Sequence, residues 1–272
     1  MKILYLGDVV GRSGRDAVID QLPRLKRDLA LDFIVVNGEN AAGGFGITRE
    51  ICVALYEAGT DVILTGNHVW DKREAISYIE QDGRLLRPAN FPAGTPGRGA
   101  AVYATTAGDK VLVVQVMGRV FMDPLDDPFA VLDKELARHS LGGTVQCIIV
   151  DIHGEATSEK TAFGHHCDGR VSMVAGTHTH IPTADTRIMT GGTAYQTDLG
   201  MCGDYDSVIG MDKAEPLRRF RRKVPGGRFE PAGGPAAVSG IFVETDNRTG
   251  KAVRAEPLRM GPGLIEAWPA KP

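Results

Sequence analysis

Short apolar runs rich in β-branched residues recur along the chain. Within each run the apolar side chains are continuous and do not alternate with polar ones, which is typical of strands buried on both faces. Strands of this kind occur mainly in parallel sheets covered by helices. Five runs have this character: residues 2–6, 33–37, 62–65, 145–150 and 171–175. The pattern therefore predicts an α/β protein.

Helical periodicity separates the first three of these runs. Between residues 18 and 29, apolar positions recur at helical spacing, and Pro23 within this stretch predicts a kink or a break. A second helix is expected between Thr48, a good N-cap residue, and Gly59, which fits the position just beyond a helix end. The alternation of strand and helix implies parallel strands joined by right-handed crossovers.

Two more helices are predicted further along the chain. Asp71 and Glu74 have the spacing of a capping box, and Gly83 would end the helix that follows them. Residues 126–139 carry an apolar stripe and predict a later helix.

The remainder of the chain is richer in strands than in helices. We expect additional strands at residues 101–106, 111–117, 193–197, 236–244 and 252–258. This many strands require two packed mixed sheets with helices outside them, which is a four-layer α/β/β/α sandwich. No shift in composition marks a boundary, so a single domain over residues 1–272 is expected.

The charge of the chain argues against binding to large anionic surfaces. The formal net charge is −3, so we expect neither stable nucleic-acid binding nor membrane association. No apolar stretch approaches the roughly 18 residues that a membrane helix needs. A basic run at residues 218–223 is the exception, and its simplest interpretation is a solvated face. A contact with phosphate or with another subunit is the alternative.

The four cysteines show no paired spacing, and they are Cys52, Cys147, Cys167 and Cys202. Their wide spacing and the absence of a secretion signal predict reduced thiols and a cytoplasmic protein.

The polar residues that follow the five predicted strands are potential metal ligands. The string G-T-H-T-H at residues 176–180 places two imidazoles one residue apart, and imidazole is the commonest metal-binding side chain. Open α/β sheets place their sites just past the carboxyl ends of strands, so we expect these residues to meet. The candidates are Asp8, Glu39, Asn40, Asn67, His68, His153, His178 and His180.

The number and type of these candidates favour two metal ions. One tetrahedral zinc needs about four ligands, and more than four are present here. Carboxylate, amide oxygen and imidazole suit iron, manganese or zinc. Two ions roughly 3.5–4 Å apart, sharing a carboxylate and a water, would use the whole set.

Taken singly, each candidate has a simpler explanation. Asp8, Asn40 and Asn67 are of types that are common in turns and helix caps, and His153 alone would be a core or surface histidine. Their common order, each beside a strand end and most beside a glycine, favours the metal interpretation. His165 and His166 lie outside this arrangement, and we expect a surface role for both.

These motifs resemble the five blocks of the calcineurin-like metallophosphoesterase superfamily. The blocks are Gly7-Asp8, Gly38-Glu39-Asn40, Gly66-Asn67-His68, His153 and Gly176-Thr177-His178-Thr179-His180. The resemblance implies a metallophosphatase-like fold and an enzyme that is a metal-dependent hydrolase of phosphoric diesters.

Three positions depart from the usual superfamily pattern. Val10 replaces a histidine, Glu39 replaces an aspartate, and Val69 replaces an acidic residue. These departures resemble the bacterial YmdB-like branch of the superfamily, as do three further strings at residues 157–160, 168–171 and 193–198. The resemblance extends over nearly the whole chain.

The resemblance also implies roles for individual residues. One metal ion would be held by Asp8, Glu39, Asn40 and His180. The other would be held by Glu39, Asn67, His153 and His178, so that Glu39 bridges the two ions. His68 would protonate the leaving alkoxide, a task that suits a side chain exchanging protons near neutral pH. A purely structural hydrogen-bonding role for His68 is the alternative.

The resemblance implies a dinuclear-metal phosphodiesterase. We expect small cyclic nucleotides as substrates, with 2′,3′-cyclic ones favoured, and in-line attack by a metal-bridging hydroxide. Iron is the favoured metal, with manganese or zinc as alternatives, and a homo-oligomer is expected. A phosphomonoesterase, another dinuclear metallohydrolase and a regulatory nucleotide-binding protein with weak catalysis remain as other interpretations.

Overall fold

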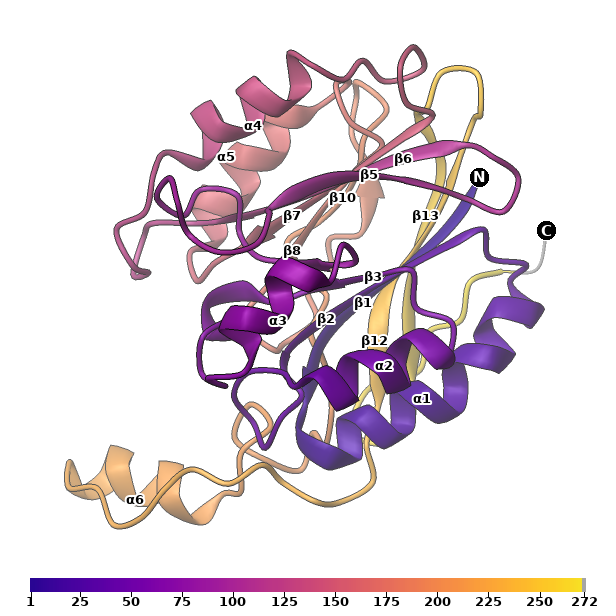
Figure 1. The fold of residues 1–272 in the computed structure, drawn as a ribbon. Helices are drawn as coiled ribbons and strands as arrows, with labels where there is room; N and C mark the ends of the chain where they lie inside the picture. The colour runs from indigo at the N-terminus through magenta and orange to yellow at the C-terminus, as the bar shows by residue number, and fades with distance from the viewer. Residues whose placement is uncertain (271–272) are drawn as a thin grey trace.

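The computed structural model describes residues 1–270 (Figure 1). The last two positions of the predicted domain, 271 and 272, lie outside the described residues. A first sheet has seven strands, in the order β13-β12-β1-β2-β3-β4, with β11 also paired to β1. Its members are β1 (Lys2–Val10), β2 (Phe33–Asn40), β3 (Val62–Leu64), β4 (Leu85–Leu86), β11 (Met201–Cys202), β12 (Val238–Thr245) and β13 (Ala252–Met260).

A second sheet has six strands, in the order β5-β6-β7-β8-β10-β9. Its members are β5 (Ala100–Ala104), β6 (Lys110–Met117), β7 (Cys147–His153), β8 (Met173–Thr177), β9 (Arg187–Ile188) and β10 (Ala194–Gln196). Both sheets are mixed, because parallel strands at the centre are flanked by antiparallel ones at one or both edges.

Helices cover the outer faces of the two sheets (Figure 1). Helices α1 (Gly11–Asp28), α2 (Arg49–Glu57) and α3 (Ala75–Gln81) lie on the side of the first sheet, and α4 (Pro128–Leu136) and α5 (Thr157–Cys167) cover the second. Helix α6 (Ala214–Arg222) projects away from the body. The predicted four-layer α/β/β/α sandwich is confirmed.

The core has three apolar layers, and single strands contribute to two of them. In β1, Ile3 and Tyr5 belong to the layer between the sheets, whereas Leu4 and Leu6 pack under α1 and α2. The strands of the second sheet divide in the same way between the middle layer and the layer under α4 and α5. This double burial explains why the strands appear in the sequence as continuous apolar runs.

The helix around Pro23, for which a kink or a break was expected, is continuous. The helix begins at Gly11 and continues through Pro23 to Asp28, so the expected break does not occur. Leu22 and Leu25, on either side of the proline, are both buried against the first sheet. Their burial holds both halves of the helix against the same surface, and this outweighs the hydrogen bond that proline removes.

The predicted capping box of α3 is wrong. The helix begins at Ala75, and no side chain caps its first turn. Glu74 instead accepts a hydrogen bond from the backbone N–H of Arg49, 3.1 Å away. Asp71 contacts the ring of His68. By contrast, the Thr48 hydroxyl accepts from the N–H of Ile51 at 3.4 Å, as expected for the N-cap of α2.

Strands from both ends of the chain pair within one sheet. Lys2 of β1 lies opposite Glu244 of β12, and β13 extends the same sheet beyond β12. We therefore propose that residues 1–270 form one domain. Within that range, no helix is both long enough and apolar enough to cross a bilayer.

A substitution at Gly176 tests the close packing of β8 against the backbone of Thr197. A Cβ at this position would lie 1.8 Å from the carbonyl oxygen of Thr197, a backbone atom that no side-chain rotation can move. Gly176→Ala is expected to destabilise the fold by about 1–3 kcal/mol, which lowers Tm by roughly 2–4 °C per kcal/mol. Differential scanning calorimetry measures the shift. Gly83→Ala is the control, because its Cβ would meet no atom within 4 Å.

Candidate metal centre

All eight predicted site residues lie together at the carboxyl ends of strands from both sheets. The first sheet contributes Asp8 within β1, Glu39 and Asn40 at the end of β2, and Asn67 and His68 in the 3₁₀ turn η1 (Gly66–His68) that follows β3. The second sheet contributes His153 at the end of β7, with His178 and His180 just past β8. The centre therefore spans the junction between the sheets.

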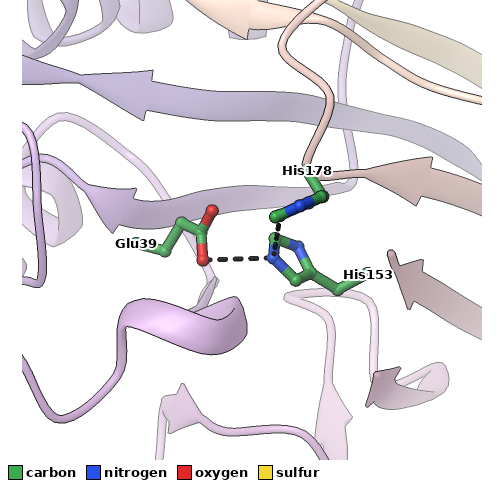
Figure 2. Close-up of side chains that lie close together, drawn as sticks. All are labelled: Glu39, His153 and His178. Carbon is green, nitrogen blue, oxygen red and sulfur yellow. Dashed lines mark hydrogen bonds and ion pairs between the residues drawn. The ribbon is translucent and has the colours of Figure 1, made fainter. Parts of the chain in front are cut away.

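One group of ligand atoms surrounds His153 (Figure 2). Its Nε2 lies 3.2 Å from Glu39 Oε2, 2.7 Å from Asn67 Oδ1 and 3.2 Å from His178 Nδ1. The ligand atoms of Glu39, His153 and His178 all lie within 4.8 Å of one another. Carboxylate, amide oxygen and imidazole thus converge on one small volume, which fits a metal ion.

A second group shares Glu39 with the first. The ligand atoms of Asp8, Glu39 and His180 also lie within 4.8 Å of one another. Asn40 joins them, because its Oδ1 lies 3.2 Å from His180 Nε2. Glu39 is the residue common to both groups, so a single carboxylate could contact two ions.

Two buried carboxylate oxygens point to cations at this place. Asp8 and Glu39 are almost completely buried. Asp8 Oδ1 and Glu39 Oε1 have no hydrogen-bond partner among residues 1–270. A buried carboxylate oxygen without a partner is strongly unfavourable, and a metal ion would satisfy it. The residues present therefore fit a pair of metal ions.

Burial and neighbouring charges shift the pKa values of the two carboxylates and of His153. Burial, and then the charge of Glu39, raise the pKa of Asp8 well above its usual value. Burial acts to raise the pKa of Glu39 as well, but the charge and hydrogen bond of His153 outweigh it and lower this pKa to about 2. Burial also opposes a charge on His153, yet Glu39 raises its pKa to about 9.

The other two histidines are held neutral. Burial, and then the charge of His153, lower the pKa of His178 to about 3. Burial likewise lowers the pKa of His180. Neutral imidazole is the form that binds metals, so both rings present a lone pair at neutral pH.

A buried hydrogen-bond chain fixes the ring of His153. The Thr177 hydroxyl donates to Asp151 Oδ1 at 2.9 Å and therefore accepts from His153 Nδ1, 2.8 Å away. Nδ1 therefore carries a proton, and Nε2 faces Glu39. Gln115 extends the chain by donating to Asp151 Oδ2 at 2.7 Å, and its Oε1 accepts from the backbone N–H of Gly66 at 3.2 Å. The chain joins the second sheet to the turn that carries Asn67.

Backbone carbonyls orient His180 and Asn40. His180 Nδ1 donates to the carbonyl oxygen of Ile209 at 2.7 Å, so Nε2 faces the centre. The Asn40 amide donates to the carbonyl oxygen of Gly44 at 2.9 Å, which leaves its Oδ1 toward His180. Both ligand atoms are thus aimed by groups outside the centre.

The segment that carries His178 and His180 has an unusual backbone. Both histidines have positive φ, 102° and 66°, a conformation that is unfavourable for residues other than glycine and is typical of functional sites. Buried Lys160 holds the segment by donating at 2.7 Å both to the carbonyl oxygen of Thr177 and to Asp198. Asp198 in turn accepts from the N–H of Thr179 at 3.0 Å.

His68 lies beside the two groups without belonging to either. Its Nδ1 is 2.6 Å from Asp71 Oδ2, and its backbone N–H donates to Glu39 Oε2 at 3.3 Å. The ring of Phe45 packs edge-on against it, with 5.0 Å between the ring centroids. His68 borders a cavity of about 420 Å³ that opens over the metal-binding groups. Its ring can therefore reach a molecule bound there.

Sequence reasoning missed several residues that support the centre. Asp71 was assigned to a helix cap, although its spacing of three residues from His68 could have suggested the pair. Asp151 lies two residues before His153, on the same face of β7, and that spacing was the available signal for the hydrogen-bond chain. Glu155 also borders the cavity, and its Oε2 lies 3.4 Å from His178 Nε2.

The remaining histidines of α5 lie away from the centre. His165 is exposed, and His166 Nε2 contacts Asp133 Oδ1 at 2.9 Å on the surface. Arg170 binds the same carboxylate at 2.7 Å. These contacts join α5 to α4 and have no connection to the metal-binding groups.

Known proteins resemble this chain over the residues that form the metal-binding groups and the cavity. The model of a family described as YmdB-like protein matches residues 4–258. The 2′,3′-cyclic-nucleotide 2′-phosphodiesterase of Bacillus subtilis (strain 168) is 46% identical over 256 residues, which are 94% of this chain and 96% of that protein.

Two crystal structures show the same fold. A hypothetical protein from Thermus thermophilus has a TM-score of 0.89 and 41% identity, over 96% of this chain and 99% of that one. A novel phosphatase from Mycoplasma pneumoniae has a TM-score of 0.89 and 34% identity, over 99% of this chain and 95% of that one.

Thr177→Val tests the hydrogen-bond chain behind His153. The substitution nearly preserves the side-chain shape but removes the hydroxyl between His153 and Asp151. Metal affinity is expected to fall by about 10–100-fold, the usual effect of losing a partner that orients a ligand. Titration of the purified protein with Mn²⁺ in a calorimeter measures it. Thr177→Ser should bind like the wild type, and unchanged affinity in the valine variant would contradict the orienting role.

Proposed function

The chain belongs to the YmdB-like protein family, and we propose that it is a dinuclear-metal phosphodiesterase that hydrolyses small cyclic nucleotides. One observation carries the proposal: Glu39 belongs to two separate groups of potential ligands at once. A bridging carboxylate is the feature that separates a two-metal site from a single one. The name of the Bacillus subtilis relative supports phosphodiester substrates and favours 2′,3′-cyclic nucleotides.

The proposed ligands follow the two groups. Asp8, Glu39, Asn40 and His180 would hold one ion. Glu39, Asn67, His153 and His178 would hold the other. All their donor atoms are oxygen or nitrogen, which suits iron, manganese or zinc alike. Of these three, we propose iron first.

Side chains of the protein are proposed to supply the proton transfer. Two bound cations would supply an attacking oxygen at neutral pH and would withdraw charge from the phosphoryl oxygens. His68 is proposed to donate a proton to the leaving alkoxide, because it borders the cavity beside both groups. Asp71 holds His68 Nδ1, so that Nε2 is the atom left to donate.

The charge of the cavity favours diesters over monoesters. Of the described residues that line it, none is lysine or arginine, whereas Glu155 adds a negative charge at its edge. A monoester dianion would need more positive charge than a diester monoanion. The cavity therefore fits the singly charged substrate better.

Two further properties are part of the proposal. All four cysteines are free and buried, which agrees with a reducing compartment such as the cytoplasm. A homo-oligomer is proposed as the working state.

Glu39→Gln tests the proposed function. The substitution keeps the shape of the side chain but removes the charge shared by the two groups. Wild-type protein is expected to hydrolyse 2′,3′-cyclic AMP in preference to p-nitrophenyl phosphate and to an amide substrate. Turnover by Glu39→Gln should fall to background, whereas Glu57→Gln on the surface of α2 should behave like the wild type. Undiminished turnover with metal still bound, measured by elemental analysis as metal per chain, would refute the bridging role.

His68→Ala separates the proton donor from the ligands. Metal content per chain should stay at the wild-type value, because neither group contains His68. Turnover of 2′,3′-cyclic AMP should slow by about 10²–10⁴-fold, the usual contribution of general acid catalysis. His165→Ala, at an exposed position of α5, is the control. Loss of metal from His68→Ala would instead identify His68 as a ligand.

A further inference from the structure

The cavity over the metal centre has two chemically different sides. One side is polar and includes Glu39, Asn40, His68, His178 and His180. The other side is apolar, and we call it the apolar wall. Its members are Phe45, Val208, Ile209, Met211, Pro216, Phe220 and Phe229. Most of the wall comes from residues 208–229, which include the projecting helix α6.

Two large apolar side chains of the wall are exposed to solvent. Phe220 is 71% exposed and Ile209 is 50% exposed. Exposed apolar surface that is continuous with a polar site is typical of a ligand subsite. We propose that the apolar wall binds the nucleobase of the substrate, with Phe220 as its main stacking surface. This inference rests on the proposed function.

Polar contacts hold α6 in place, and the Phe220 ring, although exposed, has Lys223 Nζ 6.0 Å from its centroid. Glu215 accepts from Arg219 at 2.7 Å and from the backbone N–H of Gly226 at 2.9 Å. The Arg219 guanidinium lies over the ring of Phe229, 4.0 Å from its centroid. Only Pro216 of this helix is buried. The aromatic ring of Phe220 is therefore positioned by its helix without being used in the core.

The wall is fixed relative to the metal centre through Ile209. The carbonyl oxygen of Ile209 accepts from His180, while its side chain lines the cavity. Met211 contributes to the wall next to it, and residues 208 and 211 pair through backbone hydrogen bonds in a tight turn. A base on the wall would thus lie beside the proposed metal ligands.

The composition of the wall predicts how selective it is. Its side chains offer apolar faces but no hydrogen-bonding groups that could read the edge of a base. Stacking on aromatic rings accepts every base, because every base has a π face. The enzyme should therefore tolerate all four bases, with kcat/KM values within about tenfold of one another.

Phe220→Ala tests the subsite with two substrates. The first is 2′,3′-cyclic AMP, and the second is glycerol 1,2-cyclic phosphate, which has the same kind of ring phosphate but no base. The variant is expected to lower kcat/KM for cyclic AMP, mainly through KM, by about 10–100-fold more than for the glycerol substrate. Phe220→Trp retains an aromatic ring and should therefore retain the preference for cyclic AMP over the glycerol substrate. Leu217→Ala, an exposed residue of α6 outside the cavity lining, should leave both rates unchanged.

Four other outcomes would reject the inference, and each would point to a different explanation. Equal losses on both substrates in Phe220→Ala would show a structural role for Phe220. No loss on either would show that the base lies elsewhere, while the proposed function stands. A change in subunit number on sedimentation, with the substrate ratio unchanged, would identify the wall as an interface between copies of the chain. A wild type that hydrolyses neither substrate would reject the proposed function and the inference with it.

Discussion

The burial of two neighbouring carboxylates is the constraint on which the centre depends. Asp8 and Glu39 are shielded from water, and each keeps one oxygen without a partner among residues 1–270. Glu39 is paired with His153, 3.2 Å away, but the two neighbouring carboxylate charges still repel each other, and that repulsion adds to the cost of burying them. The nearby rings of His178 and His180 are held neutral by burial and supply lone pairs only. Bound cations would offset the cost of burying the two carboxylates. The neighbouring strand ends and turns hold the carboxylates where they can contact such cations.

The two sheets meet this constraint jointly. The first sheet supplies the carboxylates and amides, and the second supplies the three histidines of the ligand groups. A polar chain through Thr177, Asp151 and Gln115 crosses the otherwise apolar space between the sheets and ends at the Gly66 turn. Such a chain stabilises only when every member is satisfied, and these three are bonded to one another and to the turn. The relative position of the sheets, and with it the distance between the ligand groups, is therefore fixed by hydrogen bonds as well as by packing.

The sequence allowed prediction of the strands and of the convergence of the site, because both follow from strong local signals. Continuous apolar runs define strands with two buried faces, and a polar residue after such a run must lie at the sheet edge. Helices α5 and α6 were not predicted, because α5 lacks a clear apolar stripe and α6 is dominated by charge. Asp71 was misassigned for a related reason: its spacing to Glu74 suited a cap, and only the tertiary fold shows that it bonds to His68 instead. Contacts between distant segments, such as His180 with Ile209, leave no periodic trace in the sequence.

Ile209 connects the apolar wall of the cavity to its metal-binding side. Its backbone carbonyl orients a proposed metal ligand, and its side chain forms part of the apolar wall. A substitution of the side chain changes the surface offered to a substrate but leaves the carbonyl in place. A change in the backbone of this turn, whose φ at Ile209 is 46°, would reach His180 directly. Because left-handed backbone is unfavourable for a β-branched residue, the surrounding contacts must hold this conformation. The wall and the metal centre are thus joined by one strained residue, and the distance between them is set by the backbone.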